Sequence, residues 1–449
     1  MPARLRPTNA PLFCGLFLLL SSSALTLPSA SVAGDSTINK ERIDETVRNS
    51  EEETVFLHET LPLDAVLTYA QGHNPTIRAA RARLTAAQER PAQVSALDDP
   101  MFTYEGFNIP ENLNFTRADN NILKLSQKLP FPGKRRLRGE IATHEVAIVS
   151  EEVRRAEIMT RADVKKAYYD LWQVHQNLLV YSREKELAAQ FAAIAEKKYA
   201  VGQVSQPDVL RAQVELTRLI NRVTTQTLKL GEVRAMLNGL LSRPPEAPLG
   251  MPQDAPQPVV KQTLAELTEL TLKNRPEITA NAAAIARDTA TLALSRKAYF
   301  PDFEVYVERF FNGGRKDGVG VILSATIPLA YRQKYDAGVA EASARLSASQ
   351  ADLHAAQDTS LAEVKGALVR AQIAVELVNL FTQTHIPQAE QTLDSSRISY
   401  QTSKVDFLSL IDSLRVVEQV HLEHIAAAAD FEKAYADLER AVGQALPGT

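Results

Sequence analysis

Glu418, His421 and His424 are the residues whose types and spacing come closest to those of a metal site. Glu418 and His421 lie three positions apart, so both would project from one face of a helix. A di-iron helical bundle needs a second Glu-x-x-His segment on a partner helix, and this sequence contains no other. We therefore predict a solvated helix face, with no metal and no cofactor, and keep a helical-bundle metalloprotein as an alternative. The sequence also lacks the common nucleophile, zinc-protease and phosphate-loop motifs, which predicts that the protein is not an enzyme.

A second group of residues could contact lipid. Cations cluster directly after two apolar segments, and aromatic residues stand beside them. Strands that cross a membrane end in aromatic girdles next to charged head groups. The predicted membrane-interface residues are Phe131, Lys134, Arg135, Tyr331 and Arg332. A charged first turn of a helix explains the same cations equally well.

Two similar segments indicate short turns between helices: YAVGQVSQPDVLRA at 199–212 and YQTSKVDFLSLIDS at 400–413. In the first, Gly202 ends one helix, while Ser205 and Pro207 begin the next. Because each turn is short, the helices on its two sides must double back. Such turns are exposed surfaces that a partner protein can contact, although helix termination alone also explains Gly202. The predicted contact residues are Val201, Gly202, Gln203, Val204, Ser403, Lys404 and Val405.

The element that organises these groups is a β-hairpin at about residues 301–328. Apolar and polar residues alternate along two runs separated by NGGRKDG, and Pro301 and Pro328 close the ends. A period of two predicts strands with one apolar face. A similar hairpin is predicted at about 100–130. Both suit a boundary between lipid and water.

The two hairpins belong to a duplication. Pro301 follows Pro100 by 201 positions, and Tyr400 follows Tyr199 by the same offset. One offset across the chain predicts two copies of a helix and hairpin unit. The predicted organisation is a first repeat at 61–243, a proline-rich linker at 244–261 and a second repeat at 262–446.

The start of the chain has the features of a secretory signal. Arg4 and Arg6 precede the apolar run 11–27, and small residues follow up to Ala33, which predicts a signal peptide at 1–33. An acidic N-terminal extension is predicted at 34–60. The only cysteine, Cys14, would leave with the signal, and lipidation of Cys14 is the alternative. The net charge of −4 becomes −6 when the two arginines are removed, which argues against nucleic acid as a partner.

Long helices account for most of the remaining sequence. From Val164 to Tyr199, apolar residues recur alternately every three and four positions, a spacing typical of coiled coils. No proline lies between Lys134 and Tyr199, so this helix could approach ~100 Å in length. Pro387 interrupts the equivalent helix of the second repeat.

Four short amphipathic strands cannot close a barrel alone. An open sheet edge is not tolerated in lipid, and bacterial barrels begin at about eight strands. Several chains must therefore pool their hairpins, and three copies would supply about twelve strands. The alternative is a soluble periplasmic coiled-coil adaptor, which has no need of lipid-facing strands.

This organisation resembles the TolC family of outer-membrane efflux channels. The resemblance covers Leu61 to Gly443 and rests on the duplication, the paired hairpins and the two turns. LPFPGKR, at 129–135, is further similar to the CzcC- and CusC-like heavy-metal efflux branch, although CusC-type members carry a lipid on a cysteine. The implied fold is mainly α with a small β part. It is a duplicated unit of long coiled-coil helices and two β-hairpins, which forms a trimeric α-barrel continuous with a shared 12-stranded transmembrane β-barrel.

The resemblance also implies the function and the partners. The chain would be a homotrimer in outer-membrane lipid and a passive, gated conduit. A periplasmic adaptor, or membrane fusion protein, and an inner-membrane pump of the RND type would complete the system. Neither the residues nor the resemblance names the cargo, so metal export, multidrug export and type I secretion stay open.

A periplasmic gate is implied as well. In the family an Asp of the first turn pairs with a Tyr of the second, which here gives Asp208 with Tyr400. Asp412 lies early in the second returning helix, so three copies would add a ring of carboxylates. The sequence departs from the family where Val405 replaces an Arg that completes the link, and where Ser409 replaces an Asp. A favourable charge at a helix N-terminus is the alternative role of Asp208.

Overall fold

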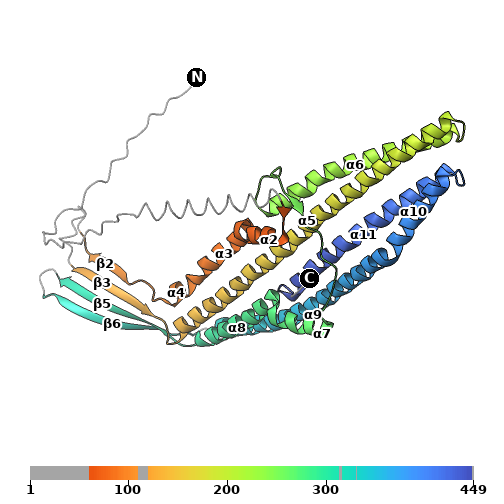
Figure 1. Ribbon diagram of the computed structural model, residues 1–449. Coiled ribbons are helices and arrows are strands. Elements are labelled where there is room, and N and C mark those ends of the chain that lie inside the picture. The colour runs from red at the N-terminus through yellow and green to blue at the C-terminus, as the bar shows by residue number, and fades with distance from the viewer. Residues whose placement is uncertain (1–59, 110–119, 313–315, 330, 447–449) are drawn as a thin grey trace, which may run out of the picture. The chain divides into compact units, whose positions relative to one another are not determined.

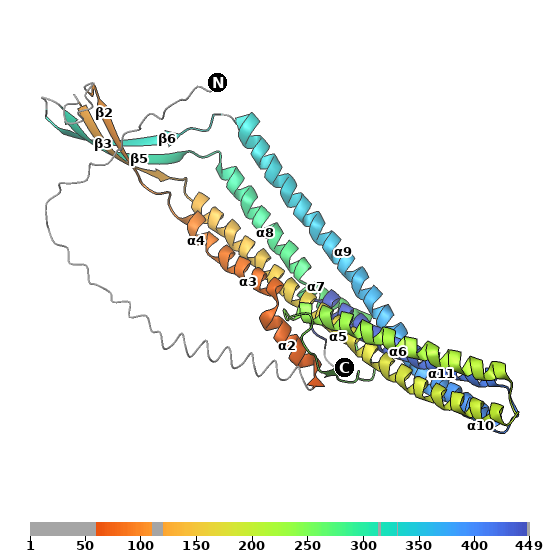
Figure 2. The ribbon, with the colours of Figure 1, turned by 90° about the horizontal axis from the view of Figure 1, so that it is seen from above.

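Long helices dominate the structure, a computed structural model that describes residues 60–109, 120–312, 316–329 and 331–446. The predicted signal peptide, Cys14 and residues 34–59 of the predicted extension lie outside the described residues. A four-stranded sheet lies at one end of the described part and two helical turns lie at the other (Figures 1 and 2). In the described ranges no helix combines the length and the apolar character needed to cross a membrane.

The elements follow one another twice in nearly the same order. The first set is α2 (Leu63–His73), α3 (Pro75–Gln88), α4 (Arg90–Ser95), β2 (Met101–Phe107), β3 (Asn120–Leu129), α5 (Lys134–Ala200) and α6 (Gln206–Leu240). The second set is α7 (Leu264–Asn274), α8 (Pro276–Lys297), β5 (Asp302–Asn312), β6 (Gly318–Thr326), η2 (Tyr331–Asp336), α9 (Ala337–Leu380), η3 (Phe381–His385), α10 (Ile386–Gln401) and α11 (Phe407–Val442). The strand β1 (Thr60–Leu61) precedes the first set and pairs in parallel with β4 (Met251–Pro252), which lies between the two sets. The helices α7 and α8 begin 201 positions after α2 and α3, the offset at which the sequence repeats.

The two long helical segments differ where the second contains Pro387. The helix α5 continues for 67 residues without interruption, whereas its counterpart is divided into α9, η3 and α10. A proline inside a helix removes an N–H donor and crowds the preceding turn. The π-helical turn η3 ends two residues before Pro387, and α10 continues from η3 without a loop. The wider turn makes room for the proline ring. The predicted interruption at Pro387 is therefore a widened turn rather than a break.

The helix α5 packs against α6, α8 and α11, and its buried face includes Tyr168, Leu171 and Trp172. Tyr168 also fixes the short parallel sheet. Its hydroxyl donates to the Leu61 carbonyl at 2.7 Å and accepts from the Gln253 N–H at 2.9 Å. Burial raises the pKa of Tyr168 to about 12, so the hydroxyl keeps the proton that it donates.

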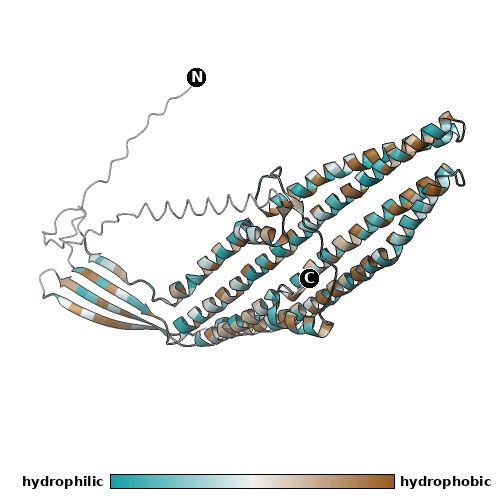
Figure 3. Ribbon diagram, viewed as in Figure 1, coloured by the Kyte–Doolittle hydropathy of each residue, from teal (hydrophilic) through white to brown (hydrophobic). Residues whose placement is uncertain are grey.

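The antiparallel sheet has the strand order β2-β3-β5-β6. Its register places one apolar row across all four strands, made of Phe102, Leu125, Val307 and Val321. Each of these side chains is exposed, from 47% for Val307 to 73% for Val321. On the opposite face the Lys124 ammonium lies 3.4 Å from the Glu308 carboxylate. The sheet therefore has one apolar and one polar face, and apolar and polar residues alternate along its strands in Figure 3.

Candidate functional site

Two connecting turns close the helical hairpins at the end opposite the sheet (Figure 1). In the first, between α5 and α6, Gly202 has a φ of +74°, a left-handed conformation that glycine adopts readily. Its N–H donates to the Tyr199 carbonyl at 2.9 Å, and the Gln203 N–H donates to the Lys198 carbonyl at 2.9 Å. These bonds satisfy the last carbonyls of α5, as helix C-termini require.

The second connecting turn, between α10 and α11, has the same backbone bonds. Ser403 takes the place of the glycine with a φ of +57°. Its N–H donates to the Tyr400 carbonyl at 3.1 Å, and the Lys404 N–H donates to the Ser399 carbonyl at 2.8 Å. Left-handed backbone is uncommon for residues other than glycine, so this turn keeps its shape against a modest local cost.

Serine and aspartate exchange places in the helix starts that follow the turns. The Asp208 carboxylate accepts from the N–H and the hydroxyl of Ser205 at 3.2 and 2.8 Å. At the equivalent positions, the Asp406 carboxylate accepts from the N–H and the hydroxyl of Ser409 at 3.0 and 2.5 Å. A carboxylate at a helix N-terminus is stabilising in either arrangement. Asp208 is therefore part of a helix cap.

Lys198 joins the two connecting turns. Its ammonium donates to the Tyr400 carbonyl at 2.6 Å, the Gln401 carbonyl at 3.2 Å and the Ser403 hydroxyl at 3.0 Å. It also lies 4.8 Å from the centroid of the Tyr400 ring. A cation at the C-terminal end of a helix stabilises its exposed carbonyls. No local signal in the sequence marks Lys198, because its partners lie about two hundred positions away on the other repeat.

The three predicted gate residues have different surroundings. Tyr400 is 2% exposed, and its hydroxyl has no hydrogen-bond partner among the described residues. Burial raises its pKa, and the negative charge of Asp208 raises it further. Asp208 and Tyr400 are therefore close enough to interact electrostatically, but within one chain they do not form the predicted pair through a hydrogen bond. Asp412 stands apart from both and is well exposed, 3.9 Å from Arg415.

Most of the residues predicted to contact a partner are accessible. Six of the seven are exposed, and Val201 has the largest exposed fraction of the apolar ones, at 68%. Val204 is the exception, because it packs against the apolar core between α5, α6 and α11. The exposed surface of the turns is therefore formed by the other six residues.

The predicted solvated face around His421 is wrong for Glu418. Glu418 is only 7% exposed, and its carboxylate forms an ion pair with Arg218 of α6. His421 instead lies 3.3 Å from Glu390 of α10, and His424 contacts Thr382. The face is partly covered because α9, α5 and α10 pack against α11. In the part of the chain that the structure describes, no three such side chains are grouped to hold a metal ion.

The predicted lipid contact of Lys134 is also wrong. Lys134 is 7% exposed, and its ammonium donates to the Asp302 carboxylate at 2.8 Å and to the Phe300 carbonyl at 3.1 Å. Asp302 also accepts from the Phe131 N–H at 2.8 Å. These bonds connect the start of α5 to the start of β5, so the Lys134 ammonium binds groups inside the protein and does not face lipid head groups.

The other predicted interface residues are placed differently. The Phe131 ring stacks on Phe300 with centroids 4.6 Å apart, and Arg135 donates to the Ser95 carbonyl at 2.8 Å. The side chains of Tyr331 and Arg332 lie outside the described residues. Phe131 and Phe300 thus form an aromatic pair at the junction of helices and strands.

Comparison with known proteins identifies the family. The model of the outer membrane efflux protein family matches residues 66–230 and 267–444, which together include both turns and both hairpins. The chain belongs to this family. The chain is thus a transport protein of the outer membrane, as the resemblance to the TolC family predicted.

A curated relative spans nearly the same length. The cobalt-zinc-cadmium resistance protein CzcC of Cupriavidus metallidurans is 22% identical over 392 residues, which cover 86% of this chain and 90% of CzcC.

Solved structures share the fold. The outer membrane protein VceC of Vibrio cholerae aligns with a TM-score of 0.74 at 18% identity, covering 85% of this chain and 96% of VceC. A structure of CusC aligns with a TM-score of 0.73 at 18% identity, covering 85% of this chain and 92% of the CusC chain. The mainly helical fold with its small sheet is therefore that of outer-membrane channels.

Proposed function

We propose that three copies of this efflux protein form one channel, to which each copy contributes four strands. The observation that carries the proposal is the sheet. Its edge strands β2 and β6 are each bonded on one side only among the described residues. An edge strand presents unpaired N–H and C=O groups, and lipid offers no water to bond them. Pairing of β6 in one copy with β2 in the next removes every edge and gives a barrel of about twelve strands.

The two faces of the sheet support the same arrangement. The exposed row of Phe102, Leu125, Val307 and Val321 suits contact with lipid. The opposite face, with Lys124 and Glu308, suits a water-filled interior. Alternation of lipid-facing and water-facing residues is what a membrane barrel requires.

The helices extend this conduit into the periplasm. With 67 residues, α5 reaches ~100 Å, and three copies of the two helical hairpins supply an α-barrel. A periplasmic adaptor meets the exposed connecting turns, and an inner-membrane pump of the RND type supplies the energy. Asp208, Tyr400 and Asp412 form the gate at this end, and the channel itself is passive.

The cargo is a divalent heavy-metal cation. Two features support it: the relative whose name specifies cobalt, zinc and cadmium resistance, and the exposed Asp412 carboxylate, which occurs in each of three copies. Rings of carboxylates favour cation entry. Drug or protein export through the same fold is the alternative that a transport assay distinguishes.

Deletion of Phe303–Ile327 tests the channel, because it removes most of β5 and β6. The expected result is loss of heat-resistant trimers and of outer-membrane insertion together. In cells that also carry the adaptor and the pump, cobalt, zinc or cadmium then accumulates. The comparison variant Gly202→Phe/Ser403→Phe alters only the turns, so it is expected to block export while trimers still form.

Each result has its contrary. A deletion variant that still inserts as a trimer contradicts the shared barrel. Normal export by the turn variant contradicts the adaptor contact. Metal content that does not depend on the presence of this protein contradicts the metal cargo.

A further inference from the structure

Four charged residues form a continuous ionic network between α6 and α11. Glu215 and Arg218 lie on α6, and Arg415 and Glu418 lie on α11. Glu215 is 1% exposed and Glu418 is 7% exposed. None of the four was singled out as a gate residue from the sequence. Both carboxylates are thus removed from water and depend on the arginines for compensation.

Glu215 is bonded through both of its oxygens. Oε1 accepts from Arg218 Nε and Nη2 at 2.9 and 2.6 Å. Oε2 accepts from Arg415 Nε and Nη2 at 3.2 and 2.7 Å. Burial raises the pKa of Glu215, but the bonds from Arg415 and Arg218 outweigh burial and leave the pKa below its ordinary value. The residue is therefore a carboxylate at neutral pH.

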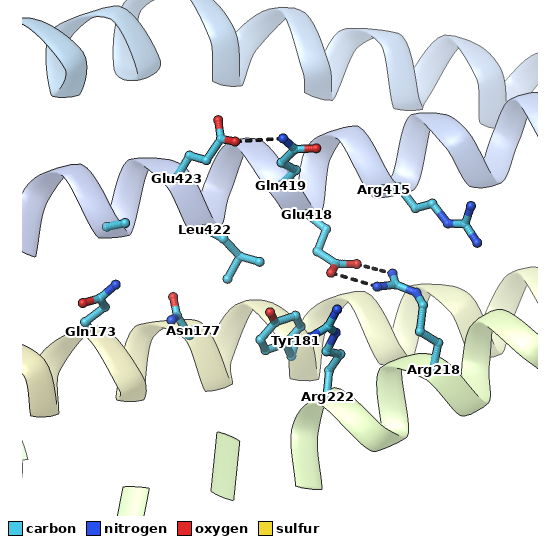
Figure 4. A pocket seen from close by; sticks show the side chains of 11 residues that line it. Gln173, Asn177, Tyr181, Arg218, Arg222, Arg415, Glu418, Gln419, Leu422 and Glu423 are labelled. Atoms are coloured by element: carbon cyan, nitrogen blue, oxygen red, sulfur yellow. Dashed lines mark hydrogen bonds and ion pairs between the residues drawn. The ribbon is translucent and has the colours of Figure 1, made fainter. Parts of the chain in front are cut away.

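Arg218 continues the network to the other helix. Its Nη1 donates to Glu418 Oε1 at 3.2 Å, and its Nη2 donates to Glu418 Oε2. Figure 4 shows this two-bond contact from α6 to α11, with Tyr181 of α5 beside it. Paired bonds between a guanidinium and a carboxylate are both strong and specific in geometry. The Arg218–Glu418 and Arg415–Glu215 contacts each join a residue of one repeat to a residue of the other.

The position of the network relates it to the gate. Glu215 lies ten residues after Ser205, and Arg415 lies nine after Asp406, so both are ~15 Å along their helices from the turns. The helix α6 packs mainly against α5, whereas α11 packs against α9, α5 and α10, and α6 and α11 have few direct contacts with each other. The network also borders a cavity of about 500 Å³ between the three helices. Relative movement of α6 and α11 therefore breaks the ion pairs that link them.

We propose that Arg415, Glu215, Arg218 and Glu418 are a lock that holds the hairpin α10–α11 against the hairpin α5–α6 in the closed channel. The lock deepens the proposed gate and rests on the proposed function. Opening breaks the two contacts between the repeats, whereas the Glu215–Arg218 pair stays within α6. It supplies a link between the repeats in a chain where Val405 cannot form the ionic link of the family.

Single-channel recording of purified trimers in planar bilayers tests the lock. Arg415→Gln and Glu418→Gln each remove one contact between the repeats, and each is expected to raise the resting open probability by at least about fivefold, the low end of coupling between sites. Because the residues act together, Glu215→Gln/Arg415→Gln is expected to exceed Arg415→Gln only slightly. Arg415→Lys keeps the charge and is expected to restore part of the closed state.

The matched control is Arg397→Gln on α10. Arg397 pairs with Asp394 on the same helix, and both side chains are largely exposed, so the open probability is expected to remain that of the unmodified channel. Heat resistance of each trimer confirms that the variant assembles. Because Arg415 is half-exposed, its replacement leaves no cavity in the apolar core.

The outcomes separate the lock from the channel itself. If the unmodified protein conducts but Arg415→Gln and Glu418→Gln both leave its open probability unchanged, the lock is wrong and the channel stands. An equal rise in Arg397→Gln also overturns the lock, because a general charge effect then explains the data. An unmodified protein that never conducts overturns both.

Discussion

Replacement of Glu184 by glutamine is expected to stabilise the trimer at alkaline pH. Glu184 lies on α5 and is 2% exposed, and its Oε2 has no hydrogen-bond partner among the described residues. Burial raises its pKa from 4.5 to about 7; Arg183 partly opposes the change, and Glu418 and Glu390 add to it. The folded protein therefore holds this proton more tightly than the unfolded chain does.

The size of the effect follows from the pKa. Each pH unit between 4.5 and about 7 corresponds to ~1.36 kcal/mol, so ionised Glu184 costs the folded state ~3 kcal/mol above neutrality. The sign follows from the direction. The contribution of Glu184 protonation to the free energy of unfolding is fully present below pH 4.5 and is lost as the pH rises through about 7. Glu184→Gln is thus expected to raise the free energy of unfolding by ~2 to 3 kcal/mol at pH 8 and to change it little at pH 5.

Unfolding of detergent-solubilised trimers at the two pH values measures this difference, with circular dichroism and trimer retention on gels as readouts. The matched control is Glu186→Gln, two residues away on α5 and exposed. Its unfolding free energy is expected to match the unmodified protein at both pH values. The reasoning fails if Glu184→Gln gives no gain at pH 8, or if its gain is the same at pH 5.

Four other substitutions have expected outcomes. Gly443→Ala places a Cβ 2.7 Å from the backbone of the α7–α8 junction at a φ of +86° and is expected to lower the unfolding free energy by ~1 to 3 kcal/mol. The control Gly231→Ala lies in open space on α6 and is expected to raise the unfolding free energy by ~0.5 to 1 kcal/mol. Equal effects of the two substitutions refute the steric argument. Lys198→Met removes the bonds to the end of α10, so amide exchange in the second turn accelerates by roughly fivefold; unchanged exchange contradicts this role. Asp208→Ala raises resting conductance and Asp412→Ala lowers cation selectivity in bilayer recordings, and no change in either leaves Asp208 as a helix cap only.

The sequence predicted the elements whose signals are local. Alternation along 301–328 marked the second hairpin, where the structure has β5 and β6. Gly202 marked the end of α5 because few other residues adopt its backbone conformation readily. The repeated segment at 400–413 then located a second turn even though Ser403 occupies the glycine position. The duplication therefore allowed the turn predicted at Gly202 to locate the equivalent turn in the second repeat, where the local sequence signal is weaker.

Partners that lie far apart in the chain could not be predicted. Lys134 is a cation directly after an apolar segment, as expected of a residue that contacts lipid head groups. In the structure it instead binds Asp302, 168 positions later, inside the protein. Glu418 was expected on a solvated face, because helical spacing shows which residues share a face but not what packs against that face. Its partner, Arg218, is 200 positions away.

The most direct test of the shared barrel is a disulfide between edge strands of neighbouring copies. Thr103 on β2 and Ser324 on β6 lie on the same face of the sheet by register. The only native cysteine, Cys14, lies in the predicted signal peptide. Thr103→Cys is combined in turn with Ile322→Cys, Ser324→Cys or Thr326→Cys, because the register between copies decides which pair meets.

Oxidation of outer-membrane preparations is expected to give, for at least one pair, a covalent species of three chains that survives boiling in detergent and disappears on reduction. Each single-cysteine variant is expected to give no such species. Monomers alone for every pair, or linkage of β2 to β6 within one chain, would contradict a barrel that closes only between three copies.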